Sequence, residues 1–234
     1  QDITRIGHMI AQVIDRRVIQ NDIALLSEHI PVTTDATTEW SNTVKLNRAL
    51  LELRHRGGGP VHINLTTTYS LDYSVKKLPQ ARMIRRIMPQ DIFPELPKGR
   101  IGVFIGAHRK FTDTEAASLD AFCATYDAVV FTDHTGGYKG KYRVPVSILS
   151  SQEKDYCSLM RVDLLIHIGD VFGGYIGMRP NMVWRVNPDG ELRDTYRKLV
   201  CVFEMEEETF FEHYADTTSP ARHDYMDACR EELR

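Results

Sequence analysis

The chain has 234 residues, 42% hydrophobic and 26% charged, which is typical of a globular protein with one large domain or two small ones. A formal charge of −3 and an isoelectric point near 6.3 exclude a general attraction to nucleic acid or to anionic membranes, and neither is predicted as a partner. The sequence has no apolar run of membrane-spanning length and no signal-peptide pattern. Its cysteines are widely spaced and unpaired, which predicts a cytoplasmic protein.

The first 70 residues are predicted to form two helices and a strand. Apolar spacing predicts a helix near Met9–Ile19, a Thr-rich stretch predicts a polar loop over Val32–Thr43, and apolar residues at helical spacing predict a second helix around 46–53. The strand is "VHINL", residues 61–65. It follows three glycines and a proline, Gly57–Pro60, which end the helix and block its continuation.

A connector is predicted over residues 71–99, because this stretch has four prolines, mixed charge and no sustained period. From residue 100 onward, short apolar segments alternate with helical patterns. The predicted strands are "RIGVFIGAH", "DAVVFTD", "VDLLIHIGD", "MVWRVN" and "KLVCVFEM". Helices are expected after a capping box at Thr112 and Glu115, near Gln152–Arg161 and over Glu206–Tyr214. The predicted fold class is α/β, with a Rossmann-like parallel sheet covered by helices on both faces.

Ligands of open parallel sheets bind at the carboxyl ends of the strands, which directs attention to the segments after Gly106, Asp133 and Gly169. These segments combine small residues with cations. Candidate nucleotide-binding residues are Gly106, Gly169, Gly173 and Gly174. No stretch matches a dinucleotide or P-loop fingerprint, so the alternative interpretation, that these glycines only turn the chain, stays open.

Metal ligation and covalent catalysis receive no support from the sequence. The four cysteines are widely spaced and form no CxxC pair, which predicts reduced thiols. They are Cys123, Cys157, Cys201 and Cys229. The stretch "HIGDVFGG" lacks the second glycine of a Gly-Asp-Gly metal motif, since Val171 stands there. No metal ligand and no catalytic residue is assigned.

The stretch "GGGPVHINL" after an amphipathic helix resembles the end of the pyrimidine-binding domain of thiamine diphosphate-dependent enzymes. Upstream, "AQVIDR" looks like the Gln-containing helix of that family, and downstream "FTDHTGGYKGKYR" resembles a segment of its central domain. Within the family, the closest likeness is to the carboligase of menaquinone biosynthesis. Parents similar to acetolactate synthase or to other 2-oxoacid decarboxylases stay open as alternatives.

The resemblance implies a domain organisation. Residues 1–70 correspond to the C-terminal part of a pyrimidine-binding domain, 71–99 to a linker and 100–234 to a central Rossmann-like domain. It also implies that Gln12 faces cofactor and substrate. The activating glutamate and the Gly-Asp-Gly motif of the family are not among these residues, so the chain is expected to be a fragment that is inactive alone.

The cofactors and partners follow from the same resemblance. Thiamine diphosphate and Mg²⁺ are expected in the parent enzyme and none in this chain. FAD, which some relatives hold in the central domain, is not expected either. The expected partners are the missing domains of the same enzyme, and the full-length protein is expected to be a homo-oligomer. The competing hypothesis is a freestanding nucleotide-binding or regulatory module without chemistry of its own.

Overall fold

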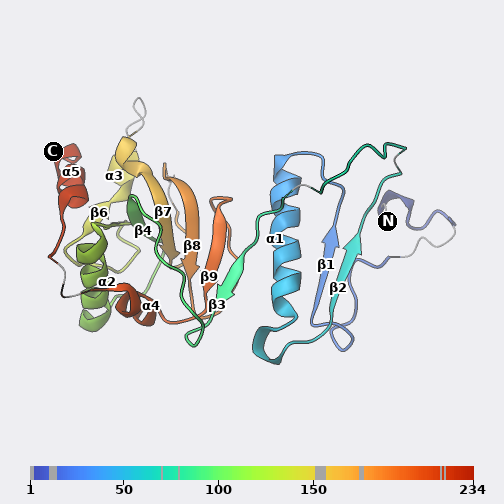
Figure 1. The fold of residues 1–234 in the computed structure, drawn as a ribbon, viewed down its shortest axis with the longest axis horizontal. Coiled ribbons are helices and arrows are strands. Elements are labelled where there is room, and N and C mark those ends of the chain that lie inside the picture. The colour runs from blue at the N-terminus through green and yellow to red at the C-terminus, as the bar shows by residue number, and fades with distance from the viewer. Residues whose placement is uncertain are drawn as a thin grey trace. The chain divides into compact units, whose positions relative to one another are not determined.

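The computed structural model describes residues 3–10, 15–69, 71–78, 80–150, 157–173, 177–216, 218 and 220–234. The chain divides into two compact units, residues 1–85 and 86–234 (Figure 1). The division falls inside the predicted connector, and residues 86–99 group with the second unit.

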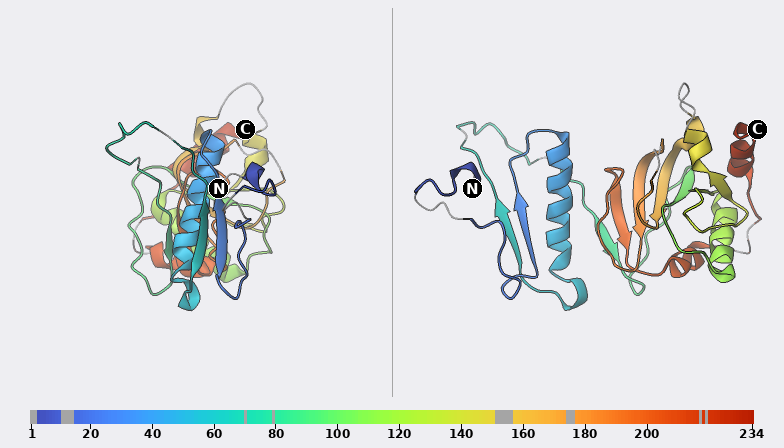
Figure 2. Two further views of the ribbon diagram at one scale, coloured as in Figure 1. Left: turned by 90° about the vertical axis from the view of Figure 1, so that its right-hand side faces the viewer. Right: turned by 180° about the vertical axis from the view of Figure 1, so that it is seen from behind.

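The first unit is a helix on a small sheet. Strands β1 (Leu26–Ile30) and β2 (Val61–Leu65) pair in parallel, and helix α1 (Ala36–Glu52) packs on both strands (Figure 2). Short 3₁₀ turns lie at Ile3–Arg5 and His55–Gly57. The strand at 61–65 is confirmed, and β1 was not predicted.

Helix α1 begins earlier than predicted because Asp35 caps it. The Asp35 carboxylate accepts hydrogen bonds from the backbone N–H groups of Thr37 and Thr38, both at 2.8 Å. The Thr38 hydroxyl in turn accepts from the Asp35 N–H at 3.0 Å, which completes a capping box. The predicted loop over Val32–Thr43 is therefore wrong from Ala36 onward. The predicted helix at Met9–Ile19 is wrong in its described part, which is irregular.

The second unit contains a seven-stranded sheet in the order β3-β9-β8-β7-β4-β5-β6. The strands are β3 (Arg85–Ile87), β4 (Ile101–Ile105), β5 (Val129–Thr132), β6 (Arg143–Pro145), β7 (Arg161–Ile168), β8 (Arg179–Val186) and β9 (Leu199–Phe203). All pairings from β9 across to β6 are parallel. This confirms the predicted fold class and the five predicted strands, whereas β3 and β6 were missed.

Helices cover both faces of this sheet. They are α2 (Asp113–Tyr126), α3 (Val146–Ser150), α4 (Glu207–Tyr214) and α5 (Asp224–Glu232). On one face Val103, Ile166 and Trp184 lie in one row, and Phe210 of α4, which packs against α2, contacts the indole edge-on. On the opposite face, Tyr225 of α5 packs on Phe131 of β5.

The opposite face also carries the row Phe104, His167 and Arg185, side by side on β4, β7 and β8. Here the cover comes from the connections after β7 and β8, since Phe172 and Tyr196 both contact the Phe104 ring. Loops rather than a helix therefore enclose this part of the sheet.

The helices of the second unit were predicted unevenly. The capped helix after Thr112 and the helix ending at Tyr214 are confirmed as α2 and α4. The helix predicted near Gln152–Arg161 is wrong where the structure describes it, because Ser158–Met160 form a 3₁₀ turn and β7 begins at Arg161. Among the described residues, no helix combines the length and apolar character that crossing a membrane requires.

Candidate functional site

The candidate site lies where the order of the strands reverses. From the central strand β4 the chain passes through α2 to β5 on one side, and it returns to place β7 on the other side of β4. The order β6-β5-β4-β7-β8-β9 has the pattern of dinucleotide-binding sheets, in which ligands bind in the crevice outside the carboxyl ends of the two central strands. The predicted segments after Gly106 and Gly169 meet at this crevice.

Close contact between two chain segments forms the floor of the crevice. The Gly106 N–H donates to the Ile168 carbonyl at 3.1 Å, and the Asp170 N–H donates to the Ala107 carbonyl at 2.7 Å. A Cβ atom on Gly106 would lie 1.9 Å from the Asp170 carbonyl oxygen, and Gly169 has a φ of +72°. Both glycines are therefore required by the backbone path itself.

Above this floor lies a cleft of about 330 Å³ lined mainly by charged side chains. The basic groups are His108, Arg109, Arg185 and Arg193. The acidic groups are Glu115, Asp170, Asp189, Glu206 and Glu207. Carboxylates thus outnumber basic groups, and most of the charges occur as pairs across the cleft.

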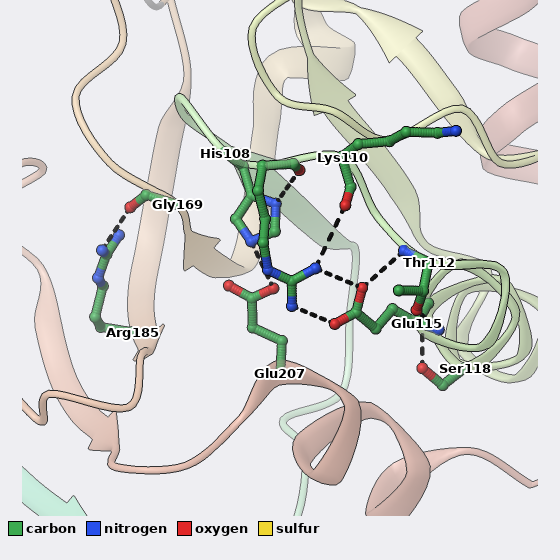
Figure 3. A network of polar contacts seen from close by, with 9 residues as sticks. His108, Lys110, Thr112, Glu115, Ser118, Gly169, Arg185 and Glu207 are labelled. Atoms are coloured by element: carbon green, nitrogen blue, oxygen red, sulfur yellow. Dashed lines mark hydrogen bonds and ion pairs between the residues drawn. The ribbon is translucent and has the colours of Figure 1, made fainter.

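His108 and Glu207 connect the loop after β4 to the start of α4 (Figure 3). The two side chains form an ion pair, with His108 Nε2 and Glu207 Oε2 3.1 Å apart, and His108 Nδ1 contacts the Arg109 carbonyl oxygen at 2.7 Å. Burial alone lowers the pKa of His108, but the hydrogen bond and charge of Glu207, with the Arg109 carbonyl, outweigh it and raise the pKa above its usual value. The imidazolium form is therefore more favoured at His108 than in a free histidine.

We expect Glu207→Gln to lower the pKa of His108, because an amide removes the negative charge that stabilises the imidazolium. An NMR titration of the His108 ring resonances measures this shift. Glu206→Gln is the matched control, since Glu206 lines the same cleft but has no ion-pair partner among the described residues. An unchanged His108 pKa in Glu207→Gln contradicts the pairing.

Arg109 and Glu115 form a second pair, between the same loop and the first turn of α2 (Figure 3). The Glu115 carboxylate also accepts from the Thr112 N–H at 2.8 Å within the capping box. The Arg109 guanidinium is the largest cause that lowers the pKa of Glu115, to about 2. The capping box predicted from the sequence is confirmed, and it also orients this carboxylate toward Arg109.

Arg185 and Asn187 lie at the carboxyl end of β8 and are buried. Arg185 is 2% exposed, and its Nη2 donates to the Gly169 carbonyl oxygen at 2.5 Å (Figure 3). Asn187 is 7% exposed. The Nε atom of Arg185 and both polar side-chain atoms of Asn187 have no hydrogen-bond partner among the described residues. Both residues line the cleft, and their unpaired donors and acceptor are buried beside it.

The structure places the remaining sequence candidates differently. Gln12 and Gly174 lie outside the described residues. Gly173 is described, and a Cβ there would meet nothing within 4 Å. Arg179 begins β8, so in this parallel sheet it lies at the edge opposite the crevice. The Arg143 guanidinium instead donates to the Asp133 carbonyl oxygen at 3.4 Å, directly after the carboxyl end of β5. Within the described ranges, no three His, Cys, Asp or Glu side chains are grouped so that they could hold a metal ion.

Sequence reasoning did not single out Arg185, Asn187 or Glu207. A signal for Arg185 exists, because an arginine within the apolar strand "MVWRVN" must be buried with a partner or at a site. Nothing local identifies Asn187. Nothing local distinguishes Glu207 from Glu206 and Glu208, the glutamates on either side of it.

The fold and the crevice define a class: a parallel α/β sheet of dinucleotide-binding order, with a charged ligand cleft at its switch point. No family model matches the chain. The chain is nevertheless similar to curated proteins described as 2-succinyl-5-enolpyruvyl-6-hydroxy-3-cyclohexene-1-carboxylate synthase. It is 25% identical to that of Bacteroides fragilis over 229 residues and 25% identical to that of Bacteroides thetaiotaomicron over 234 residues.

A third relative, from Phocaeicola vulgatus, is 24% identical over 228 residues. Each match covers 90% of this chain and 41% of the relative, so the chain spans about two fifths of the length of these curated relatives. The chain is thus distantly homologous to this synthase over a partial length. The relation suggested by the short motifs of the sequence is confirmed at this level.

Proposed function

We propose that this chain is part of a thiamine diphosphate-dependent 2-oxoacid decarboxylase or carboligase related to this synthase, and that it does not catalyse by itself. In the proposal, residues 1–70 complete a pyrimidine-binding domain and residues 100–234 are the central domain. The supporting observation is homology along 90% of the chain to proteins more than twice as long. The two compact units of the chain agree with this assignment.

Thiamine diphosphate supplies the stabilised carbanion needed to remove CO₂ from a 2-oxoacid and to form a new carbon–carbon bond. The described residues do not fit a Mg²⁺–diphosphate site, because they contain no group of three potential ligands. The proposal therefore assigns the metal and the diphosphate to other domains of a homo-oligomeric, cytoplasmic parent enzyme. It leaves to this chain the contact made by Gln12, which stays a prediction.

Two measurements on this chain and its parent test the proposal. Calorimetry of the chain with thiamine diphosphate and Mg²⁺ is expected to show no saturable binding. The protein encoded by the whole reading frame around this chain is expected to release CO₂ from a 2-oxoacid only when both cofactors are present. Saturable micromolar binding of thiamine diphosphate to the chain contradicts the proposal. Release of CO₂ by the longer protein without the two cofactors contradicts it as well.

A freestanding nucleotide-binding module is the second candidate, supported by the strand order and by the crevice. The charges of the cleft disfavour it, because five carboxylates against four basic groups repel a diphosphate. Accordingly, the purified chain is expected to be colourless and to retain no flavin. Flavin absorbance in the purified chain supports this second candidate instead.

A further inference from the structure

Arg185 and Asn187 have an unusual combination of burial and unused hydrogen-bonding capacity. A guanidinium carries five N–H donors, and the fold uses Nη2 of Arg185 on the Gly169 carbonyl while leaving Nε without a partner in the described structure. The Asn187 amide lacks both a donor and an acceptor partner there. Leaving such groups buried and unpaired is costly, and a ligand in the cleft that they line removes this cost.

The backbone of Asn187 is held in place by two hydrogen bonds. The Asn187 N–H donates to the Phe203 carbonyl at 3.1 Å, which joins the end of β8 to β9. The Asn187 carbonyl accepts from the Gly190 N–H at 3.1 Å, which closes a turn. The amide therefore projects from a fixed point of the sheet, as a binding residue requires.

The charges of the cleft are arranged by depth. Arg109, His108 and Arg193 each have a carboxylate partner: Glu115, Glu207 and Asp189 respectively. Among the described residues that line the cleft, Arg185 is the one basic group without such a partner, and it is buried. Asp170 and Glu206 are exposed carboxylates with no ion-pair partner in the described structure. A buried positive charge thus lies beneath two unpaired negative charges near the solvent.

From this arrangement we infer that the cleft binds a small zwitterionic amino carboxylate. A carboxylate matches the guanidinium of Arg185 and the N–H₂ of Asn187, because charge-assisted hydrogen bonds to arginine are the strongest of their kind. An adjacent ammonium group matches the side-chain amide oxygen of Asn187 and the carboxylates of Asp170 and Glu206. The volume of about 330 Å³ is at the small end of ligand sites, as an amino acid requires.

Two other ligand classes fit less well. Near neutral pH, inorganic phosphate carries between one and two negative charges and a nucleotide carries about two or more, and these charges meet the surplus of carboxylates. A plain carboxylate uses Arg185 but leaves the side-chain amide oxygen of Asn187 and the two exposed acids without a donor. These differences define matched probes, since propionate is alanine without its ammonium group.

The test measures binding of L-alanine, glycine, propionate and inorganic phosphate to the full chain by NMR titration. We expect saturable binding of an amino acid with a Kd on the order of 0.1–1 mM, given the few heavy atoms of such a ligand. Propionate and phosphate are expected to bind at least about tenfold more weakly, since each lacks part of the hydrogen-bonding set.

Variants assign the binding to this cleft. Arg185→Met and Asn187→Ala are each expected to weaken alanine binding about tenfold or more, whereas Arg179→Met, at the start of β8 on the opposite edge of the sheet, leaves it unchanged. Circular dichroism shows whether each variant folds. If Arg185→Met does not fold, the test rests on Asn187→Ala. The inference is overturned by propionate or phosphate binding as tightly as alanine, by alanine binding that both variants retain, or by no saturable amino-acid binding.

Discussion

Gly106→Ala is expected to lower the free energy of unfolding of the second unit by about 2–4 kcal/mol, because the new methyl group overlaps the backbone of the neighbouring strand end. Its Cβ would lie 1.9 Å from the Asp170 carbonyl oxygen and 3.0 Å from the Asp170 carbonyl carbon. Neither atom can move alone, since the Asp170 N–H is bonded to the Ala107 carbonyl at 2.7 Å. Relief therefore requires that β4 and β7 separate at their carboxyl ends.

Gly173→Ala is the matched control, because a Cβ at that position would meet nothing within 4 Å. Its effect on the free energy of unfolding is expected to stay within about 0.5 kcal/mol. Urea unfolding followed by Trp184 fluorescence, in a Trp40→Phe background, measures both variants in the second unit. Equal stability of the two variants contradicts the structural role of Gly106.

The inner strands of the second unit could be predicted because they are buried on both faces. Such strands are continuous apolar runs and do not alternate apolar with polar residues. All five residues of β4 are buried, and the sequence "IGVFI" shows this directly. Short edge strands give no such signal. Strand β6 has only three residues, and Arg143 among them is exposed. It is defined by its pairing with β5, which the local sequence does not show. Strand β1, "LSEHI", mixes polar and apolar residues on a small sheet and was missed for the same reason.

Helix boundaries depended on whether a cap was recognised. The Thr112–Glu115 box was identified, and α2 begins where it predicts. The box at Asp35 and Thr38 was overlooked, because several threonines in succession have low helix propensity and suggested a loop. The described part of Met9–Ile19 shows the opposite error: apolar spacing alone predicted a helix, although the segment has little core to bury itself against.

The candidate site could be located from the sequence, but its side chains could not be assigned. Strand ends after Gly106 and Gly169 were expected to meet, and they do. The pairing of His108 with Glu207 joins residues 99 positions apart in the chain, and no local pattern encodes it. Burial of Arg185 depends on β8 being an inner strand, which only the sheet order shows.

Lowering the pH from about 6.5 to about 5 is expected to cost the second unit about 2 kcal/mol of stability through His167 alone. Burial, assisted by the charges of Arg185 and Arg193, lowers the pKa of His167 from 6.5 to about 3. Between these two values the unfolded chain binds a proton at this residue and the folded chain does not. Stability from His167 is therefore complete above about pH 6.5 and is lost progressively as the pH falls toward about 3.

His167→Leu isolates this contribution, because leucine keeps an apolar side chain against Phe104 and Tyr196 and cannot be protonated. The variant is expected to change stability at pH 7 by less than about 1.5 kcal/mol. Its stability should fall between about pH 6.5 and pH 5 by about 2 kcal/mol less than that of the wild type. His134→Gln, at a side chain that is 90% exposed, should keep the wild-type pH dependence. Urea unfolding at several pH values measures all three proteins. If His167→Leu has the same pH dependence as the wild type, His167 binds its proton in the folded state as readily as in the unfolded chain. In that case the buried position beside Arg185 tolerates a second positive charge, which contradicts the lowered pKa of His167.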